Sequence, residues 1–449
     1  MITPERLGSE RFREDYGLRA AYVAGAMVKG IASTALVIRM ARAGFLSFFG
    51  SGGLRLAEIE AAILQIQQAL PGGAPYGVNL LADPSRPEEE RALVDLLLRH
   101  GVRNLEASAF MQVSPALVQF RLTGLATDAQ GRLSVPNRVI AKISRPEVAA
   151  SFLSPAPRAM VERLLAEGRI SEQEAALAER LPVASDLNVE ADSGGHTDGG
   201  VTSVLLPAIL RLRDRLQEER GYETPVRVGT SGGIGTPEAA ACAFLLGADF
   251  LGTGSINQCS VEAGTSEAVK EMLQEIGVQD TAYAPAGDMF ELGSKIQVMR
   301  KGVFFPAKAN RLYDLWRSHA SFEAIEAPVR REIQDKYFKR SFEEVFRETR
   351  AHYMTAFPEQ IERAERNPKA MMALVFRWYF VHTMRLALAG DSAQRVDFQV
   401  HTGPALGAFN QWVKGSALED WRNRHVDAVA EHLLQACADY MNQRFRAFA

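Results

Sequence analysis

The strongest constraint on the fold is a regular alternation of short apolar runs and amphipathic stretches over the first 256 residues. Eight runs have the length and composition of buried strands, and segments with helical periodicity separate them. The predicted strands cover residues 19–27, 44–50, 75–81, 102–110, 138–144, 183–190, 225–229 and 249–254. The predicted helices cover residues 33–43, 57–70, 87–100, a segment near Pro115, an enlarged insertion at 146–181, 204–219 and 237–246.

Eight such units predict an α/β fold, a closed parallel (β/α)8 TIM barrel. An open doubly wound sheet would show the same alternation, and only the number of units favours the barrel. In a barrel, functional side chains gather at the carboxyl ends of the strands. The unusual residues of this sequence fall at or just past those ends: Met27, Gly52, Asn79, Glu106, Lys142, Glu190 to His196, Gly232 and Gly254.

Helical periodicity replaces this alternation after residue 300. The predicted helices there cover residues 309–319, 328–339, 342–353, 358–366, 368–388 and 418–446. We therefore predict a barrel domain at 1–305 and a mainly α-helical C-terminal domain at 306–449. An apolar stripe at helical spacing, from Met371 to His382, is expected to be core. The segment 401–410 is loop-like, and it could reach the active site or join two helices.

Composition excludes several classes of function. The 449 residues carry 51 Lys and Arg against 54 Asp and Glu, so no electrostatic footprint for nucleic acid or an anionic membrane is present. No apolar run has the length of a membrane span, and the first thirty residues mix acids with bases, which predicts a cytoplasmic protein without a targeting peptide. The three cysteines form no CxxC pair, so we expect buried thiols, neither a disulfide framework nor a metal site.

The sequence EADSGGHTD, residues 190–198, is the best candidate for an active-site edge. Gly194 and Gly195 can adopt positive φ and let a flat ligand approach the backbone, while His196 is presented where the sixth strand ends. Asp192 and Asp198 flank the histidine with negative charge. An ordinary surface turn remains the alternative for this stretch.

Two glycine-rich turns follow the seventh and eighth strands. After the seventh strand come Gly232 and Gly233, and then a helix start with Thr236 as its N-cap and Pro237 at the first helical position. Gly254 and Ser255 follow the eighth strand. Exposed backbone amides at these two places form a recurrent phosphate site of the barrel fold. For either turn alone, the alternative is that its glycines only allow a tight turn of the chain.

The spacing of these glycines differs from GxGxxG, and GxxxxGK[ST] does not occur, which argues against a Rossmann site and a P-loop. A monophosphate held there would place an attached ring over the barrel mouth, and flavin mononucleotide (FMN) has a suitable shape. Lys142 could neutralise the pyrimidine or ribityl region, and Asn79 could bond the ring edge. Equally, Lys142 could form a salt bridge with Glu106 or Glu190.

The chain as a whole resembles the PfaD-type trans-acting enoyl reductases of polyunsaturated fatty acid and trans-acyltransferase polyketide synthases, within the 2-nitropropane dioxygenase-like flavoproteins. The resemblance rests on phrases that span nearly the whole sequence: AYVAGAMVKGIAS, FFGSGGL, PYGVNLL, EASAF, IAKISRPEVA, EADSGGHTD, GGIGTPEAA, GTGSINQ, EAGTSEAV, MFELGSKIQVMRKGVFFPAKANRLYDL, ALVFRWYF and GPALGAFNQWVKGS. One departure follows Asp198, where we expect Asn-Arg-Pro and the chain has Gly199-Gly200-Val201.

The resemblance implies a barrel that binds FMN, NADPH as the reductant, and an α,β-unsaturated acyl thioester carried on an acyl carrier protein. The catalytic residue it implies is His196. The predicted cofactor-binding residues are Ala26, Met27, Asn79, Lys142, Glu190, Gly194, Gly195, Gly232, Gly233, Gly254 and Ser255.

In the predicted mechanism His196 polarises the thioester or donates a proton to the α-carbon, and Asp192 or Asp198 tunes the imidazole. The helical domain would face substrate and carrier protein. Basic residues could meet an acidic carrier protein, although a solvated helix face explains any one of them equally well: Arg311, Arg317, Arg330 and Arg331. A homodimer is compatible with the sequence. The alternatives are a nitronate monooxygenase with the same FMN and histidine, and a non-catalytic scaffold.

Overall fold

The computed structural model describes residues 1–448, apart from the side chains of residues 355 and 356. These residues form two compact units. The first unit contains Met1–Ser193, Asp198–Thr265 and the chain from Ala408 onward, and the second contains Gly194–Thr197 and Ser266–Gly407. Within the described residues, no helix combines the length and the apolar composition needed to cross a bilayer.

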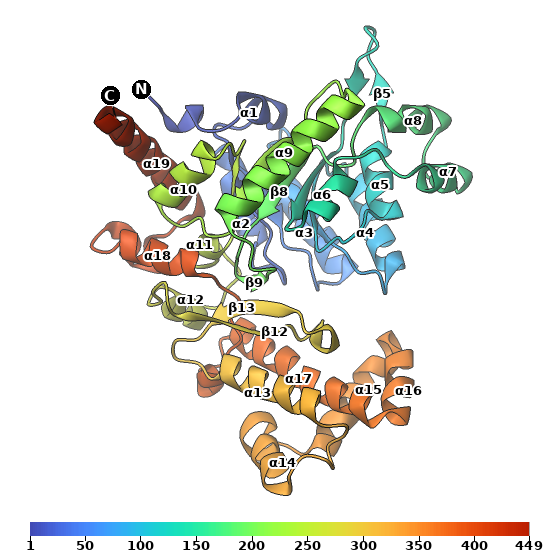
Figure 1. Cartoon of the computed structure of the whole chain (residues 1–449), viewed down its shortest axis with the longest axis vertical. Coiled ribbons are helices and arrows are strands. Elements are labelled where there is room, and N and C mark those ends of the chain that lie inside the picture. Colours follow the sequence, from blue (N-terminus) through green and yellow to red (C-terminus); the bar gives the residue numbers. More distant parts are fainter. Residues whose placement is uncertain (449) are drawn as a thin grey trace. The chain divides into compact units, whose positions relative to one another are not determined.

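A closed barrel of eight parallel strands forms the centre of the first unit (Figure 1). The strands are β1 Tyr22–Ala24, β2 Leu46–Phe49, β3 Gly77–Leu81, β4 Asn104–Ser108, β7 Arg138–Ile143, β8 Asp186–Glu190, β10 Arg227–Ser231 and β11 Leu251–Thr253. All eight predicted strands are confirmed. The barrel closes because β1 pairs with β2 on one side and with β11 on the other, which excludes the open doubly wound sheet.

Helices follow the strands, as the alternation predicts. The first unit contains η1 Pro4–Arg6, α1 Glu10–Tyr16, α2 Thr34–Arg42, α3 Leu56–Ala69, α4 Pro87–Arg99, α5 Pro115–Leu122, α6 Pro146–Phe152, α7 Arg158–Ala166, α8 Glu172–Leu177, η2 Ala178–Arg180, α9 Thr202–Arg220, α10 Pro237–Leu245, α11 Ser255–Gln258, η6 Ala417–Glu419, η7 Trp421–Asn423 and α19 Val426–Phe448. A short hairpin joins β5 Ala126–Thr127 to β6 Leu133–Ser134. Side-chain caps explain several helix starts, for example Ser33 and Ser114, whose hydroxyl oxygens accept backbone N–H bonds.

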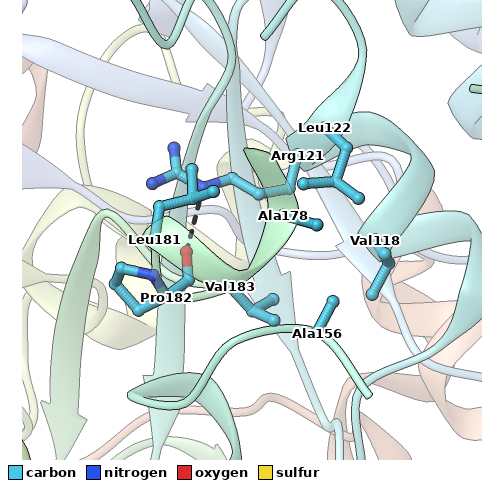
Figure 2. Close-up of a pocket in the computed structure, with 8 residues that line it drawn as sticks. All are labelled: Val118, Arg121, Leu122, Ala156, Ala178, Leu181, Pro182 and Val183. Atoms are coloured by element: carbon cyan, nitrogen blue, oxygen red, sulfur yellow. Dashed lines mark hydrogen bonds between the residues drawn. The ribbon is translucent and has the colours of Figure 1, made fainter. Parts of the chain in front are cut away.

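The helical insertion predicted at 146–181 consists of α6, α7, α8 and η2. Figure 2 shows Arg121 of α5 extended toward Pro182, whose carbonyl oxygen accepts its Nε hydrogen at 3.2 Å. Arg121 also donates to the carbonyl of Asn137 at 2.8 Å and to Ser185 Oγ at 2.7 Å. Burial lowers the pKa of this guanidinium to about 10. The surrounding apolar pocket has essentially no free volume, so its role is structural.

The last helix, α19, belongs to the barrel unit and packs against α10 and α2. The division of the chain therefore differs from the expected boundary between 305 and 306: the second unit begins at Ser266, and the chain returns to the first unit at Ala408. The physical reason is the apolar face of α19, which includes the buried Val429 and Leu433. Cys259 and Cys437 are buried, as expected, but Cys242 is exposed on the outward face of α10.

The second unit combines a small antiparallel sheet with helices. The sheet has the order β12 Thr281–Pro285, β13 Lys295–Met299 and β9 Gly195–His196. The remaining elements are α12 Glu267–Leu273, η3 Phe290–Leu292, α13 Phe305–Ser318, α14 Ala327–Ile333, the π-helix η4 Gln334–Phe338, α15 Phe342–Ala356, α16 Pro358–Arg366, α17 Pro368–Ala389 and η5 Ser392–Asp397, followed by α18 Pro404–Trp412, which ends in the first unit. The helical region after residue 300 is thus confirmed.

An aromatic core holds the second unit together. Phe305, Phe376 and Tyr379 are fully buried in it, and Tyr379 lies on the predicted stripe of α17. Two predictions about this region were wrong. Most of the expected loop at 401–410 is the helix α18, and the helix expected at 418–446 begins only at Val426 because two short 3-10 helices precede it.

A buried ion pair lies at the amino ends of two neighbouring barrel strands. Asp186 is fully buried and accepts hydrogen bonds from Arg227 Nε, from Arg227 Nη2 at 3.1 Å and from the Tyr16 hydroxyl at 2.7 Å. Arg227 also pairs with Asp15. Removal of the buried carboxylate would leave a desolvated guanidinium with a weaker set of partners.

We therefore expect Asp186→Ala to lower the free energy of unfolding by about 3–5 kcal/mol. Glu162→Ala, which removes the exposed ion pair with Arg158, should cost less than about 1 kcal/mol. Urea unfolding followed by circular dichroism measures both changes. Equal destabilisation by the two substitutions would contradict the assigned role of Asp186.

Candidate active site

The turn after β10 has the conformation of an anion cradle. Gly232 and Gly233 have φ angles of +86° and +75°, which favour glycine. A Cβ atom at Gly232 would lie 2.6 Å from the carbonyl oxygen of Ala191, so close packing also requires glycine there. Thr236 then caps α10, with Pro237 at its first position, as predicted.

The turn after β11 lies beside it, because β10 and β11 are paired neighbours. No heavy atom lies within 4 Å of a Cβ built on Gly233 or on Gly254, so both turns border open space. The hydroxyl of Ser231 at the end of β10 is buried and has no hydrogen-bond partner in the described residues. Backbone amides, open space and an unsatisfied hydroxyl fit a phosphate group.

Asn79, Glu106, Lys142 and Glu190 come together at the same rim of the barrel. Asn79 lies opposite Glu106 on paired strands and donates to Ser108 Oγ at 2.9 Å. Lys142 Nζ lies 2.9 Å from Glu190 Oε1, which is one of the two salt bridges considered from the sequence. Burial alone would lower the pKa of Lys142, but the carboxylates of Glu190 and Glu106 raise it above its ordinary value.

Glu106 is a fully buried carboxyl group. Its Oε2 accepts the backbone N–H of Ala26 at 3.0 Å, whereas its Oε1 has no partner among the described residues. Burial raises the pKa of Glu106 to about 7, and the attraction of Lys142 only partly opposes this. A buried carboxyl group with a pKa near neutrality makes this rim of the barrel a candidate functional site. The adjacent Met27 lies in the turn after β1, where its carbonyl accepts the N–H of Ala32.

Asp198 is held by the barrel unit. Its carboxylate accepts from Ser144 Oγ at 2.5 Å and from Arg145 at 2.9 Å and 3.1 Å. Hydrogen bonding by Arg145 holds the pKa of Asp198 below its usual range. These bonds tether Asp198 to the turn after β7.

His196 has a carboxylate partner, Asp288, which no motif indicated. His196 Nε2 lies 2.9 Å from Asp288 Oδ1, and both residues belong to the second unit. Asp288 immediately precedes the phrase MFELGSK, in a loop 92 residues further along the chain. That proximity to a conspicuous phrase is the only sequence signal that could have indicated it.

The two glycines before His196 accommodate the chain itself. A Cβ at Gly194 would lie 2.7 Å from the backbone of Thr402, and one at Gly195, whose φ is +83°, would lie 3.4 Å from His401 Nδ1. The interpretation that these glycines only make room for a flat ligand was therefore incomplete. Within the second unit they allow the segment around His401 to pass beside β9.

Three of the four arginines expected to face a carrier protein contact other residues of this chain. Arg311 forms a two-pronged ion pair with Glu332 at 2.8 Å and 3.2 Å. Arg317 lies over the ring of Tyr313, and Arg330 donates to the carbonyl of Phe322. Arg331 is exposed. Among these four, Arg331 is the residue for which the structure gives no internal role.

Comparison with known proteins gives relatives over nearly the whole chain. Polyketide biosynthesis protein PksE of Bacillus subtilis is 53% identical over 446 residues, which cover 99% of this chain and 58% of PksE. The crystal structure of the enoyl reductase domain of MlnA, from the macrolactin biosynthesis cluster of Bacillus amyloliquefaciens, is 45% identical with a TM-score of 0.95 over 99% of each chain. The chain belongs to the PfaD-type enoyl reductase family.

Several curated relatives of this PfaD-type protein are longer. ThaF of Burkholderia thailandensis is 54% identical over 441 residues, which cover 98% of this chain but 38% of ThaF. Residues 319–398 match the family model of the helical domain inserted in [acyl-carrier-protein] S-malonyltransferase. FabK of Thermotoga maritima, 18% identical with a TM-score of 0.58 over 98% of this chain and 99% of that chain, supports the fold alone.

This PfaD-type protein thus carries two sets of candidate site residues, one in each unit. The barrel rim offers amide-lined turns, an ion pair and a buried carboxyl group, which suit a phosphorylated aromatic cofactor. The sheet of the second unit offers the His196 imidazole paired with a carboxylate, which suits proton donation or hydrogen bonding.

The raised pKa of Glu106 has a consequence for stability. Its folded value of about 7 lies above the ordinary 4.5, so the folded state holds this proton more tightly and loses stability as the pH rises through that interval. The loss is on the order of 3 kcal/mol. Glu106→Gln should remove this part of the decline in urea-unfolding free energy between pH 5 and pH 8. Parallel declines in the variant and the wild type would show that Glu106 titrates ordinarily.

Proposed function

We propose that the protein is an FMN-dependent enoyl reductase that consumes NADPH and acts in trans on α,β-unsaturated acyl thioesters attached to an acyl carrier protein. The observation that carries the proposal is the match over 99% of each chain to the enoyl reductase domain of MlnA. A polyunsaturated fatty acid synthase protein of Thraustochytrium supports the same context of chain synthesis, because it is 45% identical over 96% of this chain and 29% of its own length.

The barrel rim is the proposed cofactor site. The two open glycine turns after β10 and β11 would hold the phosphate of FMN. The Lys142 ammonium would lie near the electron-rich part of the ring, and Glu190 and Asn79 would orient the polar groups around it. When bound, FMN supplies the hydride-transfer chemistry that no protein side chain can provide.

His196 is the proposed proton donor or polarising group. An imidazole titrates near neutral pH, and the carboxylate of Asp288 holds the Nε2 edge of the ring. Reduction of an enoyl thioester adds a hydride to the β-carbon and a proton to the α-carbon. His196 would donate this proton or a hydrogen bond to the acyl group, and Asp288 would orient the imidazole.

The phosphate site can be tested by substitutions that leave the fold intact. Gly254 has a φ of -130°, and a Cβ there would meet nothing, so Gly254→Ala should preserve the melting temperature. The added methyl group would occupy the space proposed for the phosphate, and we expect FMN affinity to fall at least tenfold in a fluorescence titration.

A pair of substitutions, at Gly233 and at Gly168, provides a matched control. Gly233 and Gly168 both have positive φ and open surroundings, so substitution by Ala should cost similar backbone strain at both positions. Gly168 lies in the loop between α7 and α8, and only Gly233→Ala should weaken FMN binding. Equal FMN affinity in both variants would place the phosphate elsewhere.

The activity is tested by anaerobic reduction of the FMN-loaded protein with NADPH, followed by addition of crotonyl-pantetheine. We expect bleaching of the flavin absorbance in the first step and its return in the second. His196→Ala should retain FMN and slow the second step about 100-fold, within the range of general acid catalysis. His319→Ala, at the end of α13, serves as the control.

The competing activity has a separate observation in its favour. A putative monooxygenase of Mycobacterium tuberculosis is 26% identical over 278 residues, which cover 55% of this chain and 66% of that protein. A nitronate monooxygenase would consume oxygen with a nitronate and ignore NADPH. Oxygen uptake with a nitronate, together with no bleaching of the flavin by NADPH, would replace the reductase proposal.

A further inference from the structure

His401 lies on the same strand edge as His196, within the second unit. An antiparallel bridge pairs His401 with Val298, and β9 pairs His196 with Ile296. Both partners belong to β13, whose opposite edge is taken by β12. The two histidines are therefore two residues apart along one edge, which is about 7 Å in an antiparallel strand.

Hydrogen bonds determine which nitrogen of His401 carries the proton. The side-chain amide nitrogen of Gln399 lies 2.8 Å from His401 Nε2, and an amide nitrogen can only donate. The amide oxygen of Gln399 lies 3.2 Å from the Thr383 hydroxyl, and with the amide in this orientation its nitrogen donates to His401. His401 Nε2 is thus an acceptor, and the ring hydrogen is on Nδ1.

The Nδ1 edge of His401 faces the turn that carries His196. A Cβ on Gly195 would lie 3.4 Å from this nitrogen, so the Nδ1 edge packs against the backbone of β9 one residue before His196. Burial of the ring lowers the pKa of His401 to about 4, the charge of His196 adds to this effect, and Asp288 opposes it. His401 is therefore neutral from pH 6 to pH 8 and presents one N–H donor beside the histidine already assigned to the reaction.

We infer that His401 is a second imidazole of the reaction site, whose Nδ1 hydrogen bonds the acyl oxygen of the thioester substrate. The inference rests on the proposed function. As a hydride adds to the β-carbon, the electron pair of the double bond moves toward the acyl oxygen, and the His401 N–H stabilises the charge that develops there. His401 keeps its proton, and His196 supplies the proton that the α-carbon takes up.

This assignment divides the chemistry between two histidines with different surroundings. His196 is half-exposed and paired with a carboxylate, which suits a group that exchanges protons. His401 bonds to the neutral Gln399 side chain, which suits a donor that does not ionise. A neutral donor beside the acyl oxygen also avoids a second positive charge near His196.

Three variants of the FMN-loaded protein test the inference by stopped-flow measurement of the two half-reactions. His401→Leu removes the donor and should slow flavin reoxidation by crotonyl-pantetheine by about 100- to 1000-fold. Flavin reduction by NADPH should change less than about twofold. His401→Asn retains an N–H near the position of Nδ1 and should recover at least tenfold of the loss. His382→Leu, which removes a histidine stacked on Trp378, should leave both rates unchanged.

A further variant covers a failure of His401→Leu to fold. Gln399→Leu retains the imidazole but removes the bond that selects its tautomer, and we expect about tenfold slower reoxidation at an unchanged melting temperature. Because His401 stays neutral, the pH dependence of the remaining reoxidation should keep the wild-type midpoint. Equal losses in both half-reactions, or rates matching His382→Leu, would overturn the inference alone. A wild-type protein that NADPH reduces but crotonyl-pantetheine does not reoxidise would overturn the proposed function, and the inference with it.

Discussion

Closure of the parallel barrel is the constraint on which the rest of the first unit depends. Because β1 pairs with both β2 and β11, the sheet has no free edge and all eight carboxyl ends meet at one rim. The two ends of the strands are used differently. At the amino ends, the buried pair of Asp186 and Arg227 joins β8 to β10 and satisfies its own charges. At the carboxyl ends, glycine turns leave amides and space available.

The rim at the carboxyl ends contains a buried carboxyl group that is incompletely hydrogen-bonded, whereas the buried carboxylate at the amino ends is fully hydrogen-bonded. Asp186 has a full set of donors, whereas Glu106 has an oxygen without a partner among the described residues and a pKa near neutrality. A carboxyl group in a dry site is destabilising unless something else requires it. Lys142 relieves the cost only partly because Glu190 holds its ammonium group. This imbalance is the kind expected where a chain is selected for a ligand more than for stability.

Sequence reasoning succeeded where the signal was local and periodic. All eight barrel strands and both glycine turns follow from runs and spacings within a few residues of each other. It failed where a long-range contact decides the outcome. The strands β12 and β13 lie outside the strand–helix alternation, and the contacts that make them strands are their pairing with each other and that of β13 with β9. The partner of His196 lies 92 residues away, and the packing of α19 on the barrel depends on α10 and α2, which no local pattern of α19 specifies.

The same distinction explains the glycines at 194 and 195. A local pattern shows that such a pair allows unusual φ and close approach, but it cannot show which group approaches. In the structure the neighbour is the segment of Thr402 and His401, so the glycines let a second histidine reach the edge of β13. A long-range contact also decides the surroundings of Asp198 in the first unit. The chain has Gly199-Gly200 where an arginine was expected, and Arg145, in the turn after β7, binds the Asp198 carboxylate. That ion pair therefore anchors the loop after β8 to the barrel, and within the second unit the carboxylate beside His196 is that of Asp288.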